Sequence, residues 1–560
     1  MSTTAPAIPS VGRDGQSGRW RRLTRRRTDR PELDARTLGR RACVFLATSV
    51  VLVVVTGFLG PSATQPRLPG KHAGLPPYSA DTNVSAWIIS ALILALLCLG
   101  AWGTHLALRA VHRGWRPNLR RFGAVSALGV VAVSLVPPMG SGDILMYAAY
   151  GRIASHYGGD VYSLTPDEIS RFTYDAVTAV VERPWQNTPS VYGPIATWSQ
   201  QFAGWLGGDS VHATVSVLQA TNALTYIVSG LLVLLLAGRD PGDRTRALLC
   251  GLANPVLIWA VVAGAHNDAQ AAMFGLMALI VLRRTPLGAG VLLGLAGAVK
   301  LSLGFYGLAF LWALRGTKRG MGELVLGAGV TLVGLYLTTS RHAFDQVLTA
   351  SKFMSTGTPA KMLYAPLTLV FSDGVARRVL SGIAWIVLVI LVAMLMQVMP
   401  RVLGRRAAMD QLDGPVDGVV AAPVARRWNG DRVRADAVRA CVALTFVWLV
   451  TALYSLPWYD VVTWLPLAGL AASRLDRLLL IRTTAMAIGY IPGRDSPDAP
   501  VGQVLLFITD RLRDTVVPVI QTVVLVLLVR WCLQRGAAGP TAMYRALREH
   551  RFTALFGRVR

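Results

Sequence analysis

An aspartate lies just beyond a predicted membrane helix, where a carboxylate could act on a substrate outside the bilayer. Asp143 follows the apolar segment 122–138. If residues 143–155 are helical, Asp143 and Tyr147 share one face of that helix, and Arg152 projects elsewhere. This placement suits a general base that takes a proton from a hydroxyl group. The alternative is a helix N-cap, because Asp is favoured there and interacts well with the helix dipole.

A lysine is predicted at membrane depth. Lys300 lies where two short apolar segments, 286–300 and 301–314, meet. We interpret these segments as a hairpin that dips into the membrane from the cytoplasm. A lysine at this depth costs about 2.5–3.5 kcal/mol on insertion scales, so it should face a cavity and a negative partner. A lipid phosphate would be such a partner, whereas the alternative is a side chain that snorkels to the interface.

Two predicted outer turns carry polar and aromatic side chains. His266, Asn267 and Asp268 are consecutive between two apolar runs. They need partners, so they either contact a ligand or form a capped tight turn. Trp458 and Tyr459 lie at another turn, where they are either interface anchors or a platform for a sugar ring.

The two longest outer loops, 139–210 and 339–376, hold the remaining candidates. Tyr192 belongs to a Tyr-Gly-Pro turn, and Asp160 rivals Asp143 as the essential carboxylate. Lys352 belongs to a group of positive charges in loop 339–376. These charges run against the positive-inside trend, so they indicate either an anion site or ordinary solvated charges.

The elements that position these residues are predicted to be membrane helices. The chain has 560 residues, 53% hydrophobic and 15% charged, which is too little charge for a water-covered surface and excludes a disordered chain. We therefore predict an all-α polytopic membrane protein. Its membrane passages, about fourteen, lie near 43–60, 84–108, 122–138, 211–237, 247–264, 269–282, 286–300, 301–314, 321–338, 377–399, 437–456, 460–473, 478–491 and 512–531.

The distribution of arginines predicts the orientation. The net charge is +26, but the arginines cluster in short segments between apolar runs, which is the positive-inside pattern and not a nucleic-acid stripe. The predicted parts are a cytoplasmic Arg-rich arm (1–42), two N-terminal membrane helices (43–121), a catalytic core with both outer loops (122–400), a cytoplasmic loop (401–436), C-terminal membrane helices (437–531) and a basic cytoplasmic tail (532–560).

Nucleotide and metal motifs are missing from the sequence. We find no P-loop, no Rossmann fingerprint and no Cys or His spacing typical of a metal site. We therefore expect no cofactor, no metal and no nucleic-acid partner. Because no cytoplasmic domain could bind a nucleotide sugar, any sugar donor is expected to be lipid-linked.

The ordered set of motifs resembles a known enzyme family. The chain is similar, from about residue 40 to 535, to the polyprenol-phosphate-mannose-dependent α-(1→6)-mannosyltransferases of actinobacteria, which belong to the glycosyltransferase C superfamily. The matching motifs are Asp143–Arg152, the Gly-Gly-Asp-Val-Tyr run that contains Asp160, 191–194, 265–268, Lys300 and 457–459.

The resemblance implies a glycosyltransferase C-type helix bundle in the plasma membrane, with short interfacial helices in its outer loops. Its termini would be cytoplasmic and its active site on the outer side. The donor would be polyprenyl-phosphate-mannose, and the acceptor a mannan on a lipid anchor. The product would be the α-(1→6)-mannan core of lipomannan and lipoarabinomannan. The superfamily's base would correspond to Asp143, although two predicted membrane passages precede the helix that leads to it.

We expect an inverting transfer in which Asp143 activates the acceptor 6-hydroxyl. Lys300, helped by Arg152 or Lys352, would stabilise the departing phosphate. The 266–268 cluster would orient the donor, and the aromatic pair at 458–459 would stack on a sugar. A transporter (flippase) of polyprenyl-linked sugar and a related arabinosyltransferase remain alternatives.

Overall fold

The computed structural model describes residues 34–70, 74–183, 185–345, 353–399, 430–492 and 500–535. Within these residues the chain is helical, and its one β-type contact is an isolated bridge between Ser62 and Gln65. The all-α prediction is confirmed for this part of the chain. The predicted loop 401–436 and tail 532–560 fall mostly outside the described residues.

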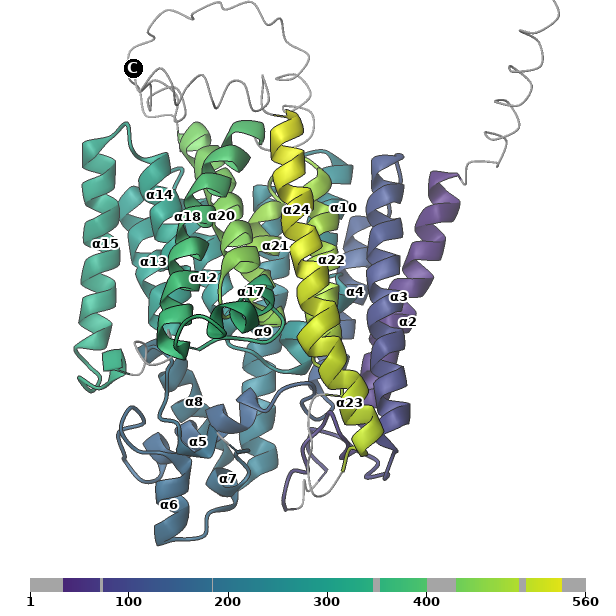
Figure 1. The fold of residues 1–560 in the computed structure, drawn as a ribbon, viewed down its shortest axis with the longest axis vertical. Helices are drawn as coiled ribbons and strands as arrows, with labels where there is room; N and C mark the ends of the chain where they lie inside the picture. Colours follow the sequence, from purple (N-terminus) through teal and green to yellow (C-terminus); the bar gives the residue numbers. More distant parts are fainter. Residues whose placement is uncertain are drawn as a thin grey trace, which may run out of the picture.

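Long apolar helices form the main body and run roughly side by side (Figure 1). They are α2 (Ala35–Phe58), α3 (Ala86–His112), α4 (Leu119–Ser134), α9 (Val211–Leu236), α15 (Lys318–Tyr336), α18 (Asp373–Val398), α20 (Gly430–Thr451), α22 (Arg474–Ile488) and α24 (Val517–Arg535). Helix α24 continues from α23 (Gln503–Arg511) and the π-helix η5 (Leu512–Val516). Helix α2 begins at Ala35, earlier than the predicted residue 43.

Shorter helices complete the bundle. They are α10 (Pro241–Cys250), α11 (Pro255–Leu257), the π-helix η2 (Ile258–Ala263), α12 (Asp268–Val281), α13 (Pro286–Val299), η3 (Leu301–Leu303), α14 (Gly304–Ala313), η4 (Pro457–Asp460) and α21 (Val461–Leu467). By length and apolar composition, six helical runs among the described residues are able to cross a membrane. Each of the fourteen predicted segments overlaps a helix. That all fourteen of them cross the membrane stays a prediction.

The predicted hairpin is formed by α13, η3 and α14. With 14 residues, α13 is about 21 Å long at 1.5 Å per residue, so it is shorter than the roughly 30 Å hydrocarbon layer. Glycines let it pack closely on α15: a Cβ on Gly290 would lie 2.3 Å from the carbonyl oxygen of Leu324. The hairpin therefore ends inside the bundle, and Lys300 stands at its turn.

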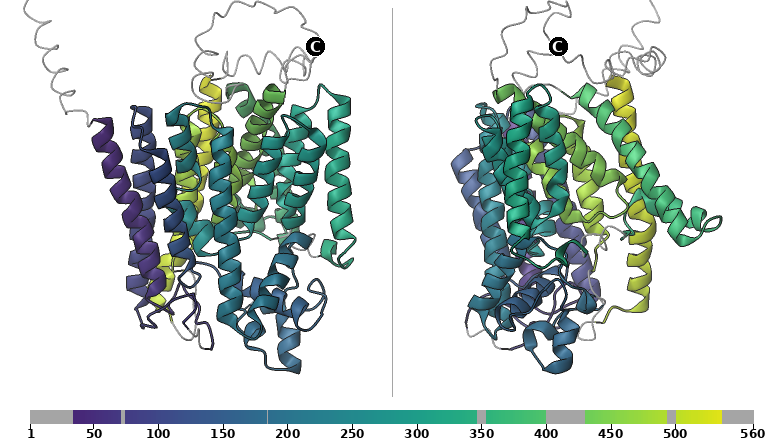
Figure 2. Two further views of the ribbon diagram at one scale, coloured as in Figure 1. Left: turned by 180° about the vertical axis from the view of Figure 1, so that it is seen from behind. Right: turned by 90° about the vertical axis from the view of Figure 1, so that its left-hand side faces the viewer.

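Loop 139–210 forms a compact helical unit at one end of the bundle (Figure 1). It contains α5 (Asp143–Ser155), α6 (Pro166–Phe172), α7 (Ala176–Ala179), η1 (Trp185–Asn187) and α8 (Pro194–Gly207). Loop 339–376 contains α17 (Pro359–Thr368). Figure 2 shows the start of α2 and the end of α24 at the end of the bundle opposite this unit. The start of α2 and the end of α24 therefore lie on the same side of the bundle, which agrees with the predicted orientation.

Candidate active site

Asp143 begins α5, as the sequence predicted, but it does not cap the helix. Gly142 occupies the N-cap position, without a side-chain cap hydrogen bond. The Asp143 side chain is 24% exposed, and its Oδ2 lies 3.3 Å from Nδ1 of His266. Partial burial alone would raise the pKa of Asp143, but His266, Ser141 and the charge of Lys300 outweigh it and hold the pKa below its ordinary value. Asp143 is therefore a carboxylate that stays ionised and is reachable from solvent.

His266 is fixed in the turn between η2 and α12. The Asn222 side-chain amide donates a hydrogen bond to its carbonyl oxygen over 2.5 Å. Its ring stacks on Trp458, with centroids 3.7 Å apart and planes at 11°. A Cβ on Gly264 would lie 2.5 Å from Nε2 of His266, so only glycine leaves room for this ring position. The imidazole is thus held against Asp143 by both backbone and aromatic contacts.

The turn that carries Trp458 and Tyr459 is held by a buried ion pair. Asp460, at the end of η4, lies 3.0 Å from Arg482 of α22, and both side chains are buried. Trp458 is itself buried, with one face against His266, so it supports the imidazole. Tyr459 is less buried than Trp458.

Lys300 binds Asp268 across the bundle. Its Nζ donates to both carboxylate oxygens of Asp268, each at 2.9 Å. The same ammonium lies 4.1 Å from the centre of the Tyr459 ring, which adds a cation–π contact. Lys300 keeps 17% of its side chain exposed, whereas Asp268 keeps 2%. The predicted negative partner exists, and it is a protein carboxylate; the snorkelling alternative is not what the structure shows.

Asn267 is an unsatisfied amide beside these charges. It occupies the N-cap position of α12 but makes no side-chain cap hydrogen bond, so the capped-turn alternative was wrong. It is 9% exposed, and in the described part of the chain neither side-chain polar atom has a hydrogen-bond partner. Buried amides normally have partners, so this one is available to a ligand hydroxyl.

The Tyr-Gly-Pro turn joins loop 139–210 to the hairpin. The Gly193 amide donates a hydrogen bond to the Val299 carbonyl over 3.1 Å, next to Lys300 in the chain. A Cβ on Gly193 would lie 2.2 Å from the carbonyl oxygen of Ala298, which explains the glycine. The preceding Tyr192 packs edge-on against Tyr147, with centroids 5.0 Å apart.

Two predicted residues do not join the cluster, and a third lies outside the described residues. Arg152 is buried, with Nε 2.6 Å from Asp175 and an Nη atom 2.7 Å from Asp209. Its charge is already neutralised, so the predicted phosphate role has no support in this geometry. Asp160 accepts hydrogen bonds from Tyr162 and Ser163 within its own turn. Lys352 lies outside the described residues.

Two members of the cluster were missed as site residues. Asn222 fixes the His266 turn, and Tyr147 packs on Tyr192. The signal for Asn222 was present, because a buried amide in the middle of an apolar helix needs a partner. Tyr147 was placed on the Asp143 face, but nothing in the sequence linked it to Tyr192.

The fold and the site define a helical protein, with six described helical runs long and apolar enough to cross a membrane and a polar centre where loop 139–210 meets the helices. Residues 44–315 match the family described as alpha-(1->6)-mannopyranosyltransferase, N-terminal domain. The matched part of the chain, which is similar to that family, contains Asp143, His266, Asp268 and Lys300.

Curated relatives agree with this assignment. A probable alpha-(1->6)-mannopyranosyltransferase of Mycolicibacterium smegmatis is 30% identical over 253 residues, which cover 44% of this chain and 43% of the relative. Alpha-(1->6)-mannopyranosyltransferase B of Corynebacterium glutamicum is 26% identical over 233 residues, 40% of this chain and 35% of the relative. An alpha-(1->6)-mannopyranosyltransferase of Mycobacterium tuberculosis is 32% identical over 154 residues, 27% of this chain and 25% of the relative.

The matched part spans less than half the length of each of these relatives. No solved structure matches the chain.

Proposed function

We propose that this protein transfers mannose from polyprenyl-phosphate-mannose to the 6-hydroxyl of a mannose on a lipid-anchored mannan. The transfer takes place on the outer face of the plasma membrane and extends the α-(1→6)-mannan core of lipomannan and lipoarabinomannan. The names of the relatives support the mannosyl group and the linkage. The observation that carries the proposal is the meeting of an ionised carboxylate, Asp143, with the Asp268–Lys300 pair at one site.

Asp143 is the proposed general base. The acceptor O6 loses its proton to the Asp143 carboxylate as it attacks C1 of the donor mannose. His266, 3.3 Å from Asp143, keeps the carboxylate ionised until the proton arrives. The C1–O bond to phosphate breaks, and its electron pair leaves on the polyprenyl phosphate. A β-linked donor gives an α-linked product by this single displacement, without a covalent enzyme intermediate.

Lys300 is the proposed electrostatic partner of the leaving phosphate. An ammonium carries three N–H donors, and Asp268 accepts two hydrogen bonds from Lys300. One donor remains for a phosphate oxygen, and the carboxylate holds the ammonium in place beforehand, which is how preorganised charge lowers a barrier. Because this cation is part of the chain, the proposed reaction needs no added metal.

The remaining groups bind the sugars. The Asn267 amide has both polar atoms without partners among the described residues, so it can pair with a hydroxyl of the donor mannose. Tyr459 offers an aromatic surface beside Lys300, and Trp458 acts through His266. Of the two predicted aromatic residues, Tyr459 is therefore proposed to contact the sugar, whereas Trp458 is proposed to support His266.

The test is a transfer assay with the purified full-length protein. Synthetic β-mannosyl-phosphoryl-polyprenol and a short α-(1→6)-mannoside are supplied with EDTA, and product size and linkage are determined. We expect one added α-(1→6) mannose with the wild type and none above background with Asp143→Asn. A product formed only from the matching arabinosyl donor, or movement of donor lipid across liposomes without product, would reject the proposal.

A further inference from the structure

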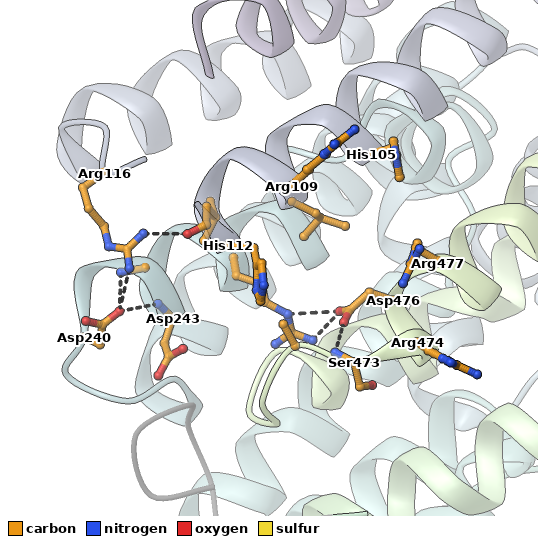
Figure 3. Close-up of a pocket in the computed structure, with 15 residues that line it drawn as sticks. His105, Arg109, His112, Arg116, Asp240, Asp243, Ser473, Arg474, Asp476 and Arg477 are labelled. Carbon is orange, nitrogen blue, oxygen red and sulfur yellow. Dashed lines mark hydrogen bonds and ion pairs between the residues drawn. The ribbon is translucent and has the colours of Figure 1, made fainter. Parts of the chain in front are cut away.

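A cavity lined by charged side chains lies at the end of the bundle opposite the Asp143 cluster. It has a volume of about 570 Å³ and is lined by the end of α3, the start of α10 and the start of α22 (Figure 3). By the arginine distribution this end is predicted to face the cytoplasm. The proposed transfer reaction uses no residue of this cavity.

The lining is basic even after its internal ion pairs are formed. It contains five arginines and three aspartates. Asp476 is bound by Arg246 and closes the capping box of α22. Asp240 caps α10 and lies 3.5 Å from Arg116. Because Asp240 caps α10 and the Ser473–Asp476 capping box closes the start of α22, the side chains of the lining are the groups left to bind an anion.

Arg109 and Arg477 are the cations left for a ligand. Neither has a carboxylate within ion-pair distance among the described residues, and Figure 3 draws both without an interaction. A third arginine, Arg474, has a neutral partner, the side-chain oxygen of Gln534 at 3.3 Å. Guanidinium groups present forked donors that match the oxygens of a phosphate. Several guanidinium groups around one cavity favour an anion that carries more than one acceptor oxygen.

The surroundings place the cavity at headgroup depth. His105 lines it and stacks on Trp102, with ring centroids 5.6 Å apart. Trp102 is 54% exposed, and exposed tryptophans on membrane helices mark the interface with water. Leu108 and Val111 add apolar wall. A basic pocket between membrane helices at this depth is suited to a lipid phosphate.

We propose that this cavity binds a phosphate group, such as the phosphodiester of an anionic lipid headgroup. Arg109 and Arg477 hold the phosphate oxygens, and Arg474 contributes positive charge at the rim. The inference does not depend on the proposed transfer reaction.

The experiment measures lipid binding by native mass spectrometry of the full-length protein. The probes are phosphatidylglycerol, phosphatidylcholine and inorganic phosphate. The test variant is Arg109→Gln/Arg477→Gln. The control is Arg120→Gln/Arg121→Gln, which removes the same charge from exposed residues at the start of α4 that do not line the cavity. Thermal unfolding of each variant in phosphatidylcholine alone verifies that it is folded.

We expect wild type and control to bind phosphatidylglycerol over phosphatidylcholine, and the test variant to bind it about tenfold more weakly. If inorganic phosphate binds with the same dependence on the two arginines and phosphatidylglycerol does not, the cavity still binds phosphate but takes it from solution. Equal losses in test and control variants would show general surface attraction and overturn the proposal. Unchanged binding of both probes in the test variant would overturn it as well.

Discussion

Lys300, at the turn between α13 and η3, donates hydrogen bonds to both carboxylate oxygens of Asp268 at the start of α12, each over 2.9 Å. The pair joins the tip of the α13–α14 hairpin to the start of α12. It makes the charge at the hairpin tip a fixed element of the site.

Substitutions at Lys300 and Asp268 distinguish the contribution of this ion pair to stability from the contribution of the Lys300 charge to transfer. Lys300→Met leaves the buried Asp268 carboxylate without its partner, which should cost about 3–5 kcal/mol of unfolding free energy. Adding Asp268→Asn should restore much of the stability but none of the transfer. Denaturant unfolding and transfer kinetics on the same preparations provide the test. Recovered transfer in the double variant would show that the lysine charge does not act on the leaving phosphate.

The acid side of the pH profile reports on the contact between His266 and Asp143. In the wild type the pKa of Asp143 is below its ordinary value, so activity should persist until the pH falls into that low range. His266→Phe keeps a flat ring against Trp458 but removes the polar neighbour. Partial burial then raises the pKa of Asp143, so activity should begin to fall at a higher pH. An acid limb that does not move would contradict this coupling.

Asp143 and its rival Asp160 are distinguished by paired amide substitutions. Asp143→Asn should lower kcat by about 10²–10⁴-fold, the range for a lost general base. Asp160→Asn should stay near the wild-type rate, because Asp160 is occupied by Tyr162 and Ser163 in its own turn. The reverse order of the two rates would move the base to Asp160.

A methyl group at Gly193 should disturb the site from a distance. In Gly193→Ala the new Cβ would overlap the Ala298 carbonyl oxygen, so the end of α13 must shift. A displacement of about 1 Å can cost roughly 10²-fold in rate. Gly304→Ala is the matched control, since a Cβ there meets no atom within 4 Å. Equal kinetics in the two variants would rule out this positioning role.

Arg152 should prove to be a structural residue. Arg152→Gln leaves Asp175 buried without its cation and should destabilise the fold by about 3–5 kcal/mol. The KM for the lipid donor should hardly change in the protein that remains folded. A selective rise in donor KM, with normal unfolding, would instead return Arg152 to the phosphate site.

Local sequence patterns predicted the positions of the helices well, but they did not predict which distant side chains contact one another. Helix α5 begins at Asp143 as expected, because acidic residues are enriched in the first turn of a helix. The need of Lys300 for a negative partner also follows from membrane depth alone. Its choice of Asp268 does not, because 32 positions separate the two residues and only packing brings them together.

Arg152 shows the same limit from the other side. In the sequence alone, an arginine that binds a phosphate looks the same as an arginine that forms ion pairs with aspartates. Asp175 and Asp209 are far from Arg152 in the chain and near it only in the fold. The early start of α2 has a simpler cause: the helix continues into its flanking polar residues, whereas the prediction followed the apolar run.

The hydrogen bond from the Gly193 amide to the Val299 carbonyl connects loop 139–210 directly to the tip of the hairpin. Tyr192 and Lys300 adjoin the two ends of that bond in the chain. If loop 139–210 moves to admit the acceptor of the proposed reaction, this hydrogen bond transmits the movement to the segment that carries the Lys300 ammonium. Under the proposed function, binding of a long acceptor glycan and the position of Lys300 are then coupled, so the length of the acceptor should change the kinetics measured for the donor.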